Sequence, residues 1–415
     1  MKTAKKKLKT IYWRIKAFLA RQYYGNPSQK LKVVGVTGTN GKTTTATLLY
    51  KVALGLGYKA GLIGTVEISA NGTELKIEHK TPTTPDSITL TKVFKQMVDM
   101  GVEYVFMEVS SHAMDQGRVF GVNFVGGIFT NLTHDHLDYH KTFENYFEAK
   151  KKFFKVLPRR AFALTNIDDA HGSKMLEGIQ ANQFSYGFNQ DFEKVHFHGE
   201  IKKIDFDGLD LVFNKIPIKS KLLGKFNAYN ILAVWSACSL LNFDMPQVNK
   251  ILENVTPPSS RFEHFMSPSG IVGVVDYAHT PDALQNVIST ARGIVANGGR
   301  VISVFGCSGD KDPFKRPIMG KIGASLSDFS IFTSDNPRSE EPASILEKMK
   351  PDLSPEELQK IKIIVDRDEA INEVGKIAKK NDIVLLMGKG HETYQEIKGV
   401  KHPWGEMERL KKALT

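Results

Sequence analysis

Residues 31–44, LKVVGVTGTNGKTT, decide the fold of this chain. The apolar run at 31–36 is typical of a buried strand, and the glycine-rich turn after it leads into a helix. Such a turn presents backbone N–H groups to phosphate, and Lys42 is placed to reach the β- and γ-phosphates of a nucleotide. The strict phosphate-loop pattern has glycine where Val36 stands, so this loop is a variant. We expect a nucleotide-binding α/β domain in which Thr43 ligates Mg²⁺.

Strands and helices alternate on both sides of a linker at residues 254–260, NVTPPSS. Before the linker, strand-like runs end at polar loops, and short alternating strands interrupt the pattern at 190–219. The runs lie at 31–36, 104–109, 126–130 and 162–165, and after the linker at 272–276, 301–305, 329–333, 361–365 and 383–387. We therefore predict an α/β protein with a central P-loop ATPase domain on a mostly parallel sheet, residues 31–257, and a Rossmann-like C-terminal α/β domain, residues 258–415.

Composition places the chain among globular proteins. Of its 415 residues, 41% are hydrophobic and 24% are charged, which fits two or three domains with cores of their own. The two cysteines, Cys238 and Cys307, cannot form a disulfide framework, so we expect a reducing compartment, the cytoplasm. No apolar stretch of the sequence is long enough to span a bilayer.

The net charge of +11 belongs to the first 32 residues. They hold ten lysines and arginines and no acidic residue, whereas the rest of the chain has 46 basic against 45 acidic residues. The body lacks the basic stripe of a nucleic-acid-binding protein, so we expect no nucleic-acid partner.

Residues 1–30 are predicted to form a basic amphipathic leader helix, which the sequence GNPS at 25–28 ends. Its apolar residues share one helical face: Leu8, Ile11, Tyr12, Ile15, Phe18, Leu19 and Tyr23. Two interpretations are open. Either residues 1–24 lie on the anionic inner face of the membrane, or the helix packs against the ATPase domain.

Two polar stretches follow predicted strands of the first domain. The motif MEVSSH at 107–112 ends a strand in a carboxylate, which places Glu108 as a ligand of Mg²⁺, directly or through a neighbouring ligand. The motif NLTHDHLDYH at 131–140 holds three histidines and two aspartates, and both a metal site and a solvated polar loop would explain it. We expect one or two metal ligands there rather than five.

A lysine falls on the apolar face of the next predicted helix, for which Thr142 is the N-cap. That face consists of Phe143, Phe147, Lys150, Phe154 and Leu157. We therefore expect Lys150 to point inward, and Lys151 and Lys152 to face solvent. Burial lowers the pKa of a lysine and makes its amine available for chemistry, and snorkelling from the edge of the core is the alternative.

Polar loops also follow four predicted strands of the second domain. They are DYAHTPD at 276–282, GCSGD at 306–310, DNPR at 335–338 and GKGHE at 388–392. Because the carboxyl ends of parallel strands meet at one edge of a sheet, we expect these loops to share a ligand crevice.

These motifs resemble the Mur ligase family. TGTNGKTT, MEVSSH, NLTHDHLDYH, EAK, DYAHTPDAL, FGCSGD and GKGHE occur in the family's order and cover the chain from Leu31 to Gln395. The resemblance is strongest to members that join meso-diaminopimelate to the D-glutamate of UDP-N-acetylmuramoyl-L-Ala-D-Glu in peptidoglycan synthesis. It implies an acyl phosphate intermediate, with ATP and two Mg²⁺ ions as cofactors. We expect a monomer.

The resemblance also implies roles for residues at matching positions. The implied catalytic residues are Lys42, Glu108, His136 and Lys150, the last as a carbamate. The implied metal ligands are Thr43, Glu108, His136 and carbamylated Lys150. The implied ATP contacts are Gly38, Thr39, Asn40, Gly41, Lys42, Thr43, Thr44, Asn166, Asn227, Arg261, Asp276 and His279. The implied muropeptide contacts are Thr83, Thr84, Ser110 and Arg118.

The stretch DNPR at 335–338 resembles the diaminopimelate version of the family's specificity loop. Arg338 can hold the distal carboxylate of diaminopimelate with two parallel hydrogen bonds, and lysine offers no such carboxylate. When lysine occupies the site, this arginine has no carboxylate partner, and that loss discriminates strongly against lysine. The implied diaminopimelate contacts are Arg316, Asp335, Asn336, Arg338, Gly388 and Glu392.

The chain departs from the family pattern in several places. Ser260 and Ser308 stand where glycine is usual, and residues 402–407 differ. The family has a uridine-binding domain where this sequence has only its leader, so we expect uridine recognition to be weak, absent or supplied otherwise. Two other functions remain open: a Mur-type ligase for a lipid-linked or non-uridylated acceptor, and a membrane-associated ATPase switch without ligase activity.

Overall fold

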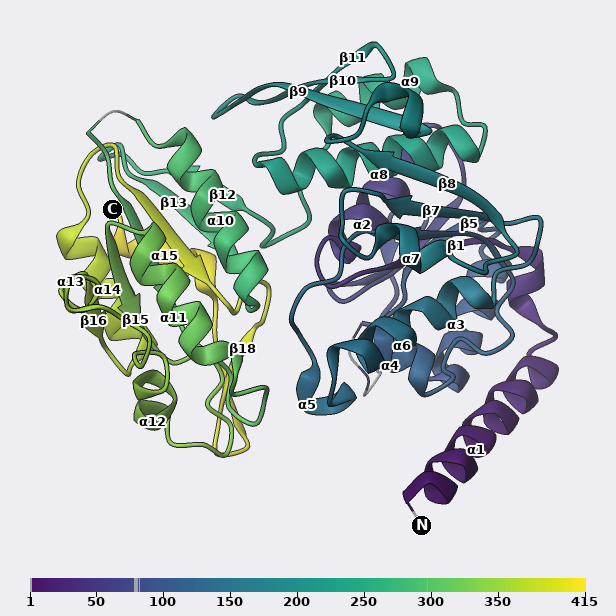
Figure 1. Ribbon diagram of the computed structural model, residues 1–415, viewed down its shortest axis with the longest axis horizontal. Helices are drawn as coiled ribbons and strands as arrows, with labels where there is room; N and C mark the ends of the chain where they lie inside the picture. The colour runs from purple at the N-terminus through teal and green to yellow at the C-terminus, as the bar shows by residue number, and fades with distance from the viewer. Residues whose placement is uncertain (1, 78–80, 82, 297) are drawn as a thin grey trace.

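The computed structural model describes residues 2–77, 81, 83–296 and 298–415, with side chains from Tyr12 onward. The chain forms two α/β units, each built on its own sheet with helices on both faces (Figure 1). The first sheet has eleven strands and the second has six, and a separate two-stranded hairpin follows the last strand of the second sheet. This architecture confirms the predicted fold class.

The first sheet is parallel at its centre and antiparallel at both ends. Its strand order is β11-β10-β9-β8-β7-β6-β1-β5-β2-β3-β4, and neighbours from β9 to β2 pair in parallel. The antiparallel β9–β11 meander accounts for the short strands predicted at 190–219. The bounds are β1 Lys32–Thr37, β2 Ala60–Ile63, β3 Ile68–Ala70, β4 Thr73–Glu74, β5 Tyr104–Glu108, β6 Phe124–Phe129, β7 Phe162–Asn166, β8 Asn182–Gly187, β9 Phe197–Asp205, β10 Gly208–Phe213 and β11 Ile216–Ser220.

Helices bury an apolar core on each face of this sheet. Helices α2, α8 and α9 supply one core, and α3, α4, α6 and α7 supply the other. The bounds are α1 Lys2–Tyr23, α2 Lys42–Gly55, α3 Ser87–Asp99, α4 Ser111–Asp115, α5 Leu137–His140, α6 Phe143–Lys155, α7 Gly172–Leu176, α8 Lys225–Leu240 and α9 Met245–Asn254, with 3₁₀ turns at Pro27–Lys30 and Phe192–Lys194.

The second sheet has the order β12-β13-β17-β14-β15-β16 and is parallel except for its edge strand β12. Helices α10, α11 and α12 cover one face, and α14 and α15 cover the other. The bounds are β12 Glu263–Met266, β13 Val272–Asp276, α10 Pro281–Ile294, β14 Val301–Phe305, α11 Lys315–Leu326, β15 Phe329–Phe332, α12 Pro342–Glu347, α13 Pro355–Leu358, β16 Ile361–Ile363, α14 Arg367–Ile377, β17 Ile383–Met387, β18 Tyr394–Ile397, β19 Val400–Pro403 and α15 Glu406–Ala413.

A close approach between β1 and α6 positions the loop that follows β1. A Cβ at Gly35 would lie 2.5 Å from the ring of Phe153, which is fully buried. Because position 35 carries no side chain, α6 packs tightly on the sheet, and Lys150, one turn before Phe153, reaches the end of β1.

The leader helix is present as α1, which ends at Tyr23, just before the predicted break. It packs on α3 through Ala17 and Ala20, which are buried. The apolar face does not make this contact, because Ile15 and Leu19 are exposed. The helix therefore does pack on the domain, but through its alanine face, and its apolar face stays exposed. Across the described residues, no helix combines the length and the apolar character needed to cross a bilayer.

Candidate active site

The phosphate loop lies between the end of β1 and the start of α2. Gly41 caps α2 with a φ of 85°, a left-handed conformation that favours glycine, and no side chain occupies the helix N-terminus. The amine of Lys42 folds over the loop and donates to the carbonyls of Gly38 at 3.0 Å and Thr39 at 2.7 Å. Desolvation lowers the pKa of Lys42, and the nearby carboxylate of Glu108 opposes this shift. The loop therefore combines free helix N–H groups with a lysine that can turn toward phosphate.

Glu108 ends β5 beside β1 and is buried. Its carboxylate accepts the backbone N–H of Thr65 at 2.7 Å and the hydroxyl of Thr65 at 3.2 Å. Its carbonyl accepts the hydroxyl of Thr84 at 2.9 Å, and this hydroxyl also accepts the N–H of Ser110 at 3.1 Å. Arg118 donates to the carbonyl of Thr84 at 2.7 Å. The residues proposed for the muropeptide thus form one network with Glu108.

Thr83 belongs to the same network. Its hydroxyl forms a hydrogen bond with the hydroxyl of Thr65 at 2.9 Å, and its φ of 66° places it in the left-handed region. Its side chain therefore lies on the side of the loop that faces the Glu108 carboxylate.

The three histidines of residues 131–140 have different hydrogen-bond partners. His134 pairs with Asp312 of the second sheet's unit at 2.9 Å, and His140 bonds to Ser111 at 2.9 Å. His136 pairs with Asp135 at 3.3 Å, and burial lowers the pKa of His136 to about 3, so its ring is neutral. Among the described residues, no group of three or more His, Cys, Asp or Glu side chains forms a metal cluster.

Lys150 points inward, as the helical spacing predicts. It is buried, donates to the carbonyl of Gly38 and lies over the ring of Tyr146 at 4.6 Å. Burial, reinforced by Lys42, holds the pKa of Lys150 well below its usual value. The prediction that Lys151 faces solvent is wrong: Lys151 is buried, and its amine reaches the carbonyl of Lys174 at 2.6 Å. Lys152 is exposed, as predicted.

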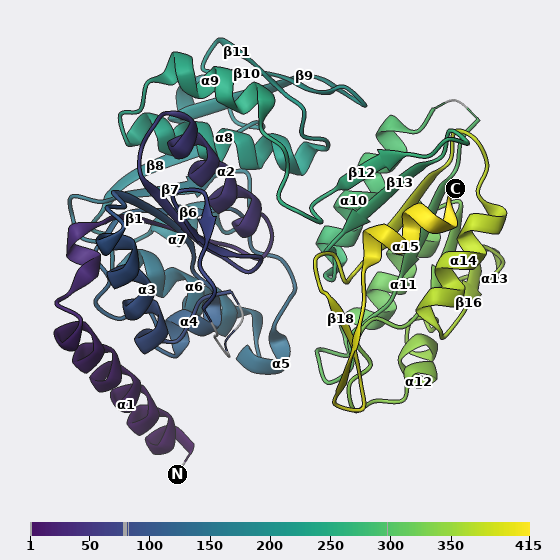
Figure 2. The same ribbon diagram turned by 180° about the vertical axis from the view of Figure 1, so that it is seen from behind.

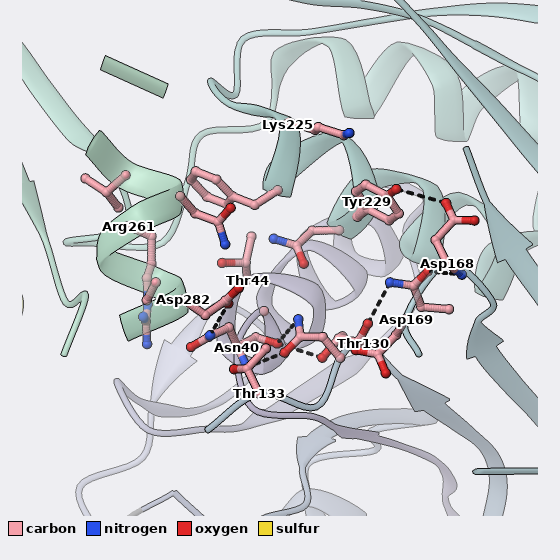
Figure 3. A pocket seen from close by; sticks show the side chains of 18 of the residues that line it. Asn40, Thr44, Thr130, Thr133, Asp168, Asp169, Lys225, Tyr229, Arg261 and Asp282 are labelled. Carbon is pink, nitrogen blue, oxygen red and sulfur yellow. Dashed lines mark hydrogen bonds between the residues drawn. The ribbon is translucent and has the colours of Figure 1, made fainter. Parts of the chain in front are cut away.

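A pocket of ≈ 370 Å³ lies next to the phosphate loop and is lined by both α/β units. Figure 3 shows Asp168 and Tyr229 on one side and Arg261 and Asp282 on the other. Among the predicted ATP contacts, those lining this pocket are Asn40, Gly41, Thr44, Asn166, Arg261 and Asp276. The lining residues that sequence reasoning missed include Asp168, Asp169, Tyr186, Lys225, Phe226, Tyr229, Asn230, Asp282 and Asn286.

Six predicted ATP contacts do not line this pocket: Gly38, Thr39, Lys42 and Thr43 of the phosphate loop, and Asn227 and His279. Asn227 donates to the carbonyl of Leu223 at 2.8 Å and accepts from Asn230, which does line the pocket. The ring of His279 bonds to the carbonyl of Tyr277 at 2.8 Å, and burial lowers the pKa of His279 to about 4. Both side chains therefore support the pocket wall from behind or beside it.

Hydrogen bonds between the two units hold the phosphate loop. Asn40 donates to the carboxylate of Asp282 at 2.7 Å, and Arg261 donates to the hydroxyl of Thr43 at 3.3 Å. Asp276, at the end of β13, accepts the N–H of Phe262, and burial raises the pKa of Asp276 to about 6. A loop that is bonded from both sides can respond to the relative position of the two units.

The loops after β15 and β17 bond to each other at the edge of the second sheet where the sequence predicts a ligand crevice, and these two loops are called the crevice below. Asn336 donates to the carboxylate of Glu392 at 2.7 Å, and the buried amine of Lys389 donates to Asn336 and Glu392 at 3.0 Å each. Oδ1 of Asp335 is buried and has no hydrogen-bond partner in the described chain. Gly388, with a φ of 113°, turns the chain beside Asp335. Lys389 was missed by sequence reasoning, although its position between two glycines in a strand-end loop was a usable signal.

The two predicted arginines differ in their surroundings. Arg316 is buried and donates to both carboxylate oxygens of Glu340, at 2.9 and 2.7 Å, which lowers the pKa of Glu340 to about 2. Arg338 is partly exposed, and its guanidinium lies 3.4 Å from the carbonyl of Gly309 and 3.7 Å from Glu396. Arg338 therefore retains donors for a ligand, whereas Arg316 already has a carboxylate partner.

Two departures from the family pattern have local explanations. Ser260 adopts a φ of 58°, the left-handed region in which glycine is easiest to place. Its N–H donates to Glu263 at 2.9 Å, which helps to fix this turn. Ser308 donates its hydroxyl to Oδ2 of Asp335, so serine here adds a hydrogen bond to the crevice.

The third departure, residues 402–407, supplies a buried ion pair behind the crevice. Glu406 pairs with Arg367, whose Nε donates to it at 3.0 Å, and both side chains are shielded from solvent. Arg367 also donates to the carbonyl of Ser334 at 3.3 Å and to that of Met387 at 3.0 Å. Ser334 and Met387 immediately precede the two crevice loops, so this pair fixes the distance between the loops at their base.

Replacing Arg367 by methionine is expected to lower the free energy of unfolding by about 3–5 kcal/mol, because the buried carboxylate of Glu406 loses its cation and, among the described residues, keeps only the indole N–H of Trp404. Replacing both Arg367 and Glu406 by methionine should recover much of that loss. Urea unfolding followed by circular dichroism measures both effects. Lys194→Met, which removes an exposed pair with Asp191, is the control and should cost less than about 1 kcal/mol. Equal losses in the single and the double variant would contradict this assignment.

The protein has a phosphate loop and a nucleotide pocket that both α/β units line, and a crevice rich in arginine and carboxylate lies beside them. This combination places the protein in the class of nucleotide-dependent ligases. Comparison with known proteins specifies the family. Residues 36–238 match the Mur ligase middle domain, and residues 260–390 match the Mur ligase glutamate ligase domain. The chain belongs to the Mur ligase family and is an acid–amino-acid ligase.

Two curated relatives share a name, UDP-N-acetylmuramoyl-L-alanyl-D-glutamate--2,6-diaminopimelate ligase. The one from Bacteroides thetaiotaomicron is 48% identical over 397 residues, which covers 96% of this chain and 81% of the relative. The one from Clostridium botulinum is 41% identical over 403 residues, with 96% and 81% covered. A solved structure of an enzyme with the same name is 32% identical, with a TM-score of 0.63 and 92% of this chain and 78% of that chain covered.

Similarity of fold extends to more distant ligases. Folylpolyglutamate synthase from Mycobacterium tuberculosis, solved with ADP and AMPPCP, has a TM-score of 0.72 over 90% of this chain and 92% of that chain. At 17% identity, this similarity concerns the fold alone.

Proposed function

We propose that the protein is an ATP-dependent ligase that joins meso-diaminopimelate to the D-glutamate of UDP-N-acetylmuramoyl-L-Ala-D-Glu in peptidoglycan synthesis. The observation that carries this proposal is the crevice, in which the DNPR loop at 335–338 meets Lys389 and Glu392. The names of the relatives support the same reaction.

The residues around the phosphate loop fit Mg²⁺. The hydroxyl of Thr43 and the carboxylate of Glu108 are oxygen donors, which Mg²⁺ prefers, and ATP phosphates would complete its coordination. Neutral His136 and a carbamate on Lys150 are the further proposed ligands. Bound Mg²⁺ would offset negative charge on the transferring phosphoryl group. Lys42 would act on the same charge once its amine turns from the carbonyls of Gly38 and Thr39 to the phosphates.

The nucleotide and acceptor sides each have a proposed set of contacts. The nucleotide would be held by Gly38, Thr39, Asn40, Gly41, Lys42, Thr43, Thr44, Asn166, Arg261 and Asp276, with Asn227 and His279 supporting the pocket. The acceptor would be held by Thr83, Thr84, Ser110 and Arg118. The D-glutamate γ-carboxylate attacks the γ-phosphorus, ADP leaves and an acyl phosphate forms; the incoming amine then attacks its carbonyl carbon and phosphate leaves. The chain's task in both steps is to hold the reactants in line.

The amino acid would enter the crevice. Arg338 would hold the distal carboxylate of diaminopimelate. Oδ1 of Asp335, which has no hydrogen-bond partner among the described residues and lies 3.9 Å from the amine of Lys389, would accept a hydrogen bond from an ammonium group. Asn336, Gly388 and Glu392 shape the same wall. Arg316 acts through Glu340, which bonds to the N–H of Asp310 in the neighbouring loop.

The proposed carbamate on Lys150 has a direct test. Protein incubated with ¹³C-bicarbonate should show a carbamate carbon by NMR, because burial lowers the pKa of Lys150 and so favours the neutral amine that carbamate formation requires. Lys150→Met should lose this signal, and its turnover should fall about 10²- to 10³-fold. Lys151→Met is the control, since the amine of Lys151 bonds to the carbonyl of Lys174 and lies 4.0 Å from Glu177, and no contact of it with the phosphate loop is seen in the described chain. A signal that persists in Lys150→Met, or no signal in the unmodified protein, would exclude the carbamate.

The reaction itself is tested by phosphate release and product mass, with ATP, UDP-N-acetylmuramoyl-L-Ala-D-Glu and diaminopimelate. We expect release that requires both the acceptor and the amino acid. Turnover only with a lipid-linked or non-uridylated muropeptide would favour the second ligase function. ATP hydrolysis that is independent of acceptor and amine would favour an ATPase switch instead.

We propose that the reaction takes place in the cytoplasm, with its nucleotide-linked substrates, and that the enzyme is a monomer. Residues 1–30, 31–257 and 258–415 are proposed as leader, ATP-binding domain and amino-acid-binding domain. The leader is proposed to contact the inner face of the membrane through residues 1–24.

A further inference from the structure

The outward face of α1 is an apolar surface with no protein covering it in the described chain. Tyr12, Ile15, Phe18, Leu19 and Tyr23 are 59%, 54%, 50%, 60% and 83% exposed. Soluble proteins rarely expose so many large apolar side chains in one stripe. Figures 1 and 2 show α1 at the edge of the molecule, with its N-terminal end away from every other element, so a flat surface can reach this face.

The orientation of α1 is fixed by its opposite face. Ala17 and Ala20 are buried against the domain, and Arg14 lies over the ring of Phe120 at 5.3 Å. At 100° per residue, Ala17 and Ala20 lie on the opposite side of the helix from Ile15 and Leu19. The packing of α1 on α3 therefore presents its large apolar side chains to the outside and does not bury them.

Basic residues flank this apolar stripe. Lys16 is exposed on one border, and Arg14 and Arg21 lie on the other. Residues 1–32 contain no acidic side chain. An apolar stripe between cationic borders is the pattern of helices that lie in the plane of an anionic lipid surface, where each basic residue adds electrostatic attraction. A second protein would need acidic borders to match it, whereas the lipid bilayer supplies both the apolar and the anionic layer.

Resting on the membrane contact proposed above for the leader, we propose that this face of α1 is the docking surface, and that it binds an anionic phospholipid bilayer. The C-terminal part of α1 then determines the orientation of the enzyme on that surface. Arg21 and Arg118 line the same small cavity between α1 and α3, and Arg118 bonds to Thr84. Docking would therefore bring the acceptor side of the site, rather than the second unit, next to the lipid.

Vesicle co-sedimentation of the full chain, without substrates, tests this proposal. We expect binding to vesicles of phosphatidylcholine mixed with phosphatidylglycerol, and little binding to phosphatidylcholine alone. Ile15→Ser with Leu19→Ser should lower binding at least about tenfold, and Lys16→Gln should lower it about fivefold. Met266→Ser, which removes an exposed apolar side chain of β12, is the matched control and should leave binding unchanged.

Three results would overturn the proposal. They are no binding to anionic vesicles, equal binding by the Ile15→Ser/Leu19→Ser variant, and a dimer in sedimentation equilibrium that this variant dissolves, since the occupant would then be a second copy. Circular dichroism should show an unchanged fold in the variants, because the replaced side chains are exposed. Vesicle binding needs no catalysis, so its failure leaves the proposed ligase reaction untouched, and the reverse also holds.

Discussion

Replacing Arg338 by alanine is expected to abolish the preference for diaminopimelate over lysine, a change of about 10⁴-fold in the ratio of their kcat/KM values. Arg338 is the guanidinium in the crevice that keeps free donors, whereas Arg316 already shares both of its Nη groups with Glu340. A distal carboxylate would pair with Arg338 through two hydrogen bonds. Lysine would leave the same guanidinium without a partner, which is the source of the discrimination.

Competition between the two amino acids, with products separated by mass, measures this ratio directly. Arg338→Lys keeps the charge but loses the planar fork, so we expect it to fall between the unmodified protein and Arg338→Ala. All three side chains occupy the same left-handed backbone position, so the comparison isolates the head group. Arg160→Ala, an exposed arginine of the first unit, should change nothing. If the ratio is unchanged in Arg338→Ala, a residue other than Arg338 determines the specificity.

Replacing Lys42 by methionine is expected to lower turnover about 10³-fold, with a smaller effect on nucleotide binding. Its amine now rests on two loop carbonyls, 3.0 and 2.7 Å away, and can exchange them for phosphate oxygens at little structural cost. Its contribution is largest where charge develops during phosphoryl transfer, so kcat should fall more than affinity.

Single-turnover formation of ADP, together with equilibrium binding of an ATP analogue, separates the two effects of Lys42→Met. Lys95→Met, an exposed lysine of α3, is the control. A variant that binds nucleotide poorly but turns over normally at saturation would contradict a role in the transfer step.

Periodic patterns allowed much of this site to be predicted. The strands that end at residues 37, 108, 276 and 387 each lead into a loop of the site, because parallel strands deliver their carboxyl ends to one edge. Lys150 was placed inward by helical spacing alone. Lys151 was misplaced by the same reasoning, because a long side chain can bury its stem and still reach the carbonyl of Lys174.

Partners far apart in the sequence could not be predicted. Glu340 pairs with Arg316 and Asp282 with Asn40, across 24 and 242 positions, and no local pattern connects them. The sequence also does not predict which face of α1 points away from the domain. Amphipathic spacing identifies an apolar face, but the small residues Ala17 and Ala20 decide which face the domain accepts.

The bonds that join Asn40 to Asp282 and Arg261 to Thr43 have a kinetic consequence. Both units line the nucleotide pocket, so we expect ADP to leave more easily once those bonds break. A cycle limited by that step would include a separation of the two units. Higher solvent viscosity should slow that step without changing the rate of the chemical steps. The rate of product release would then limit kcat.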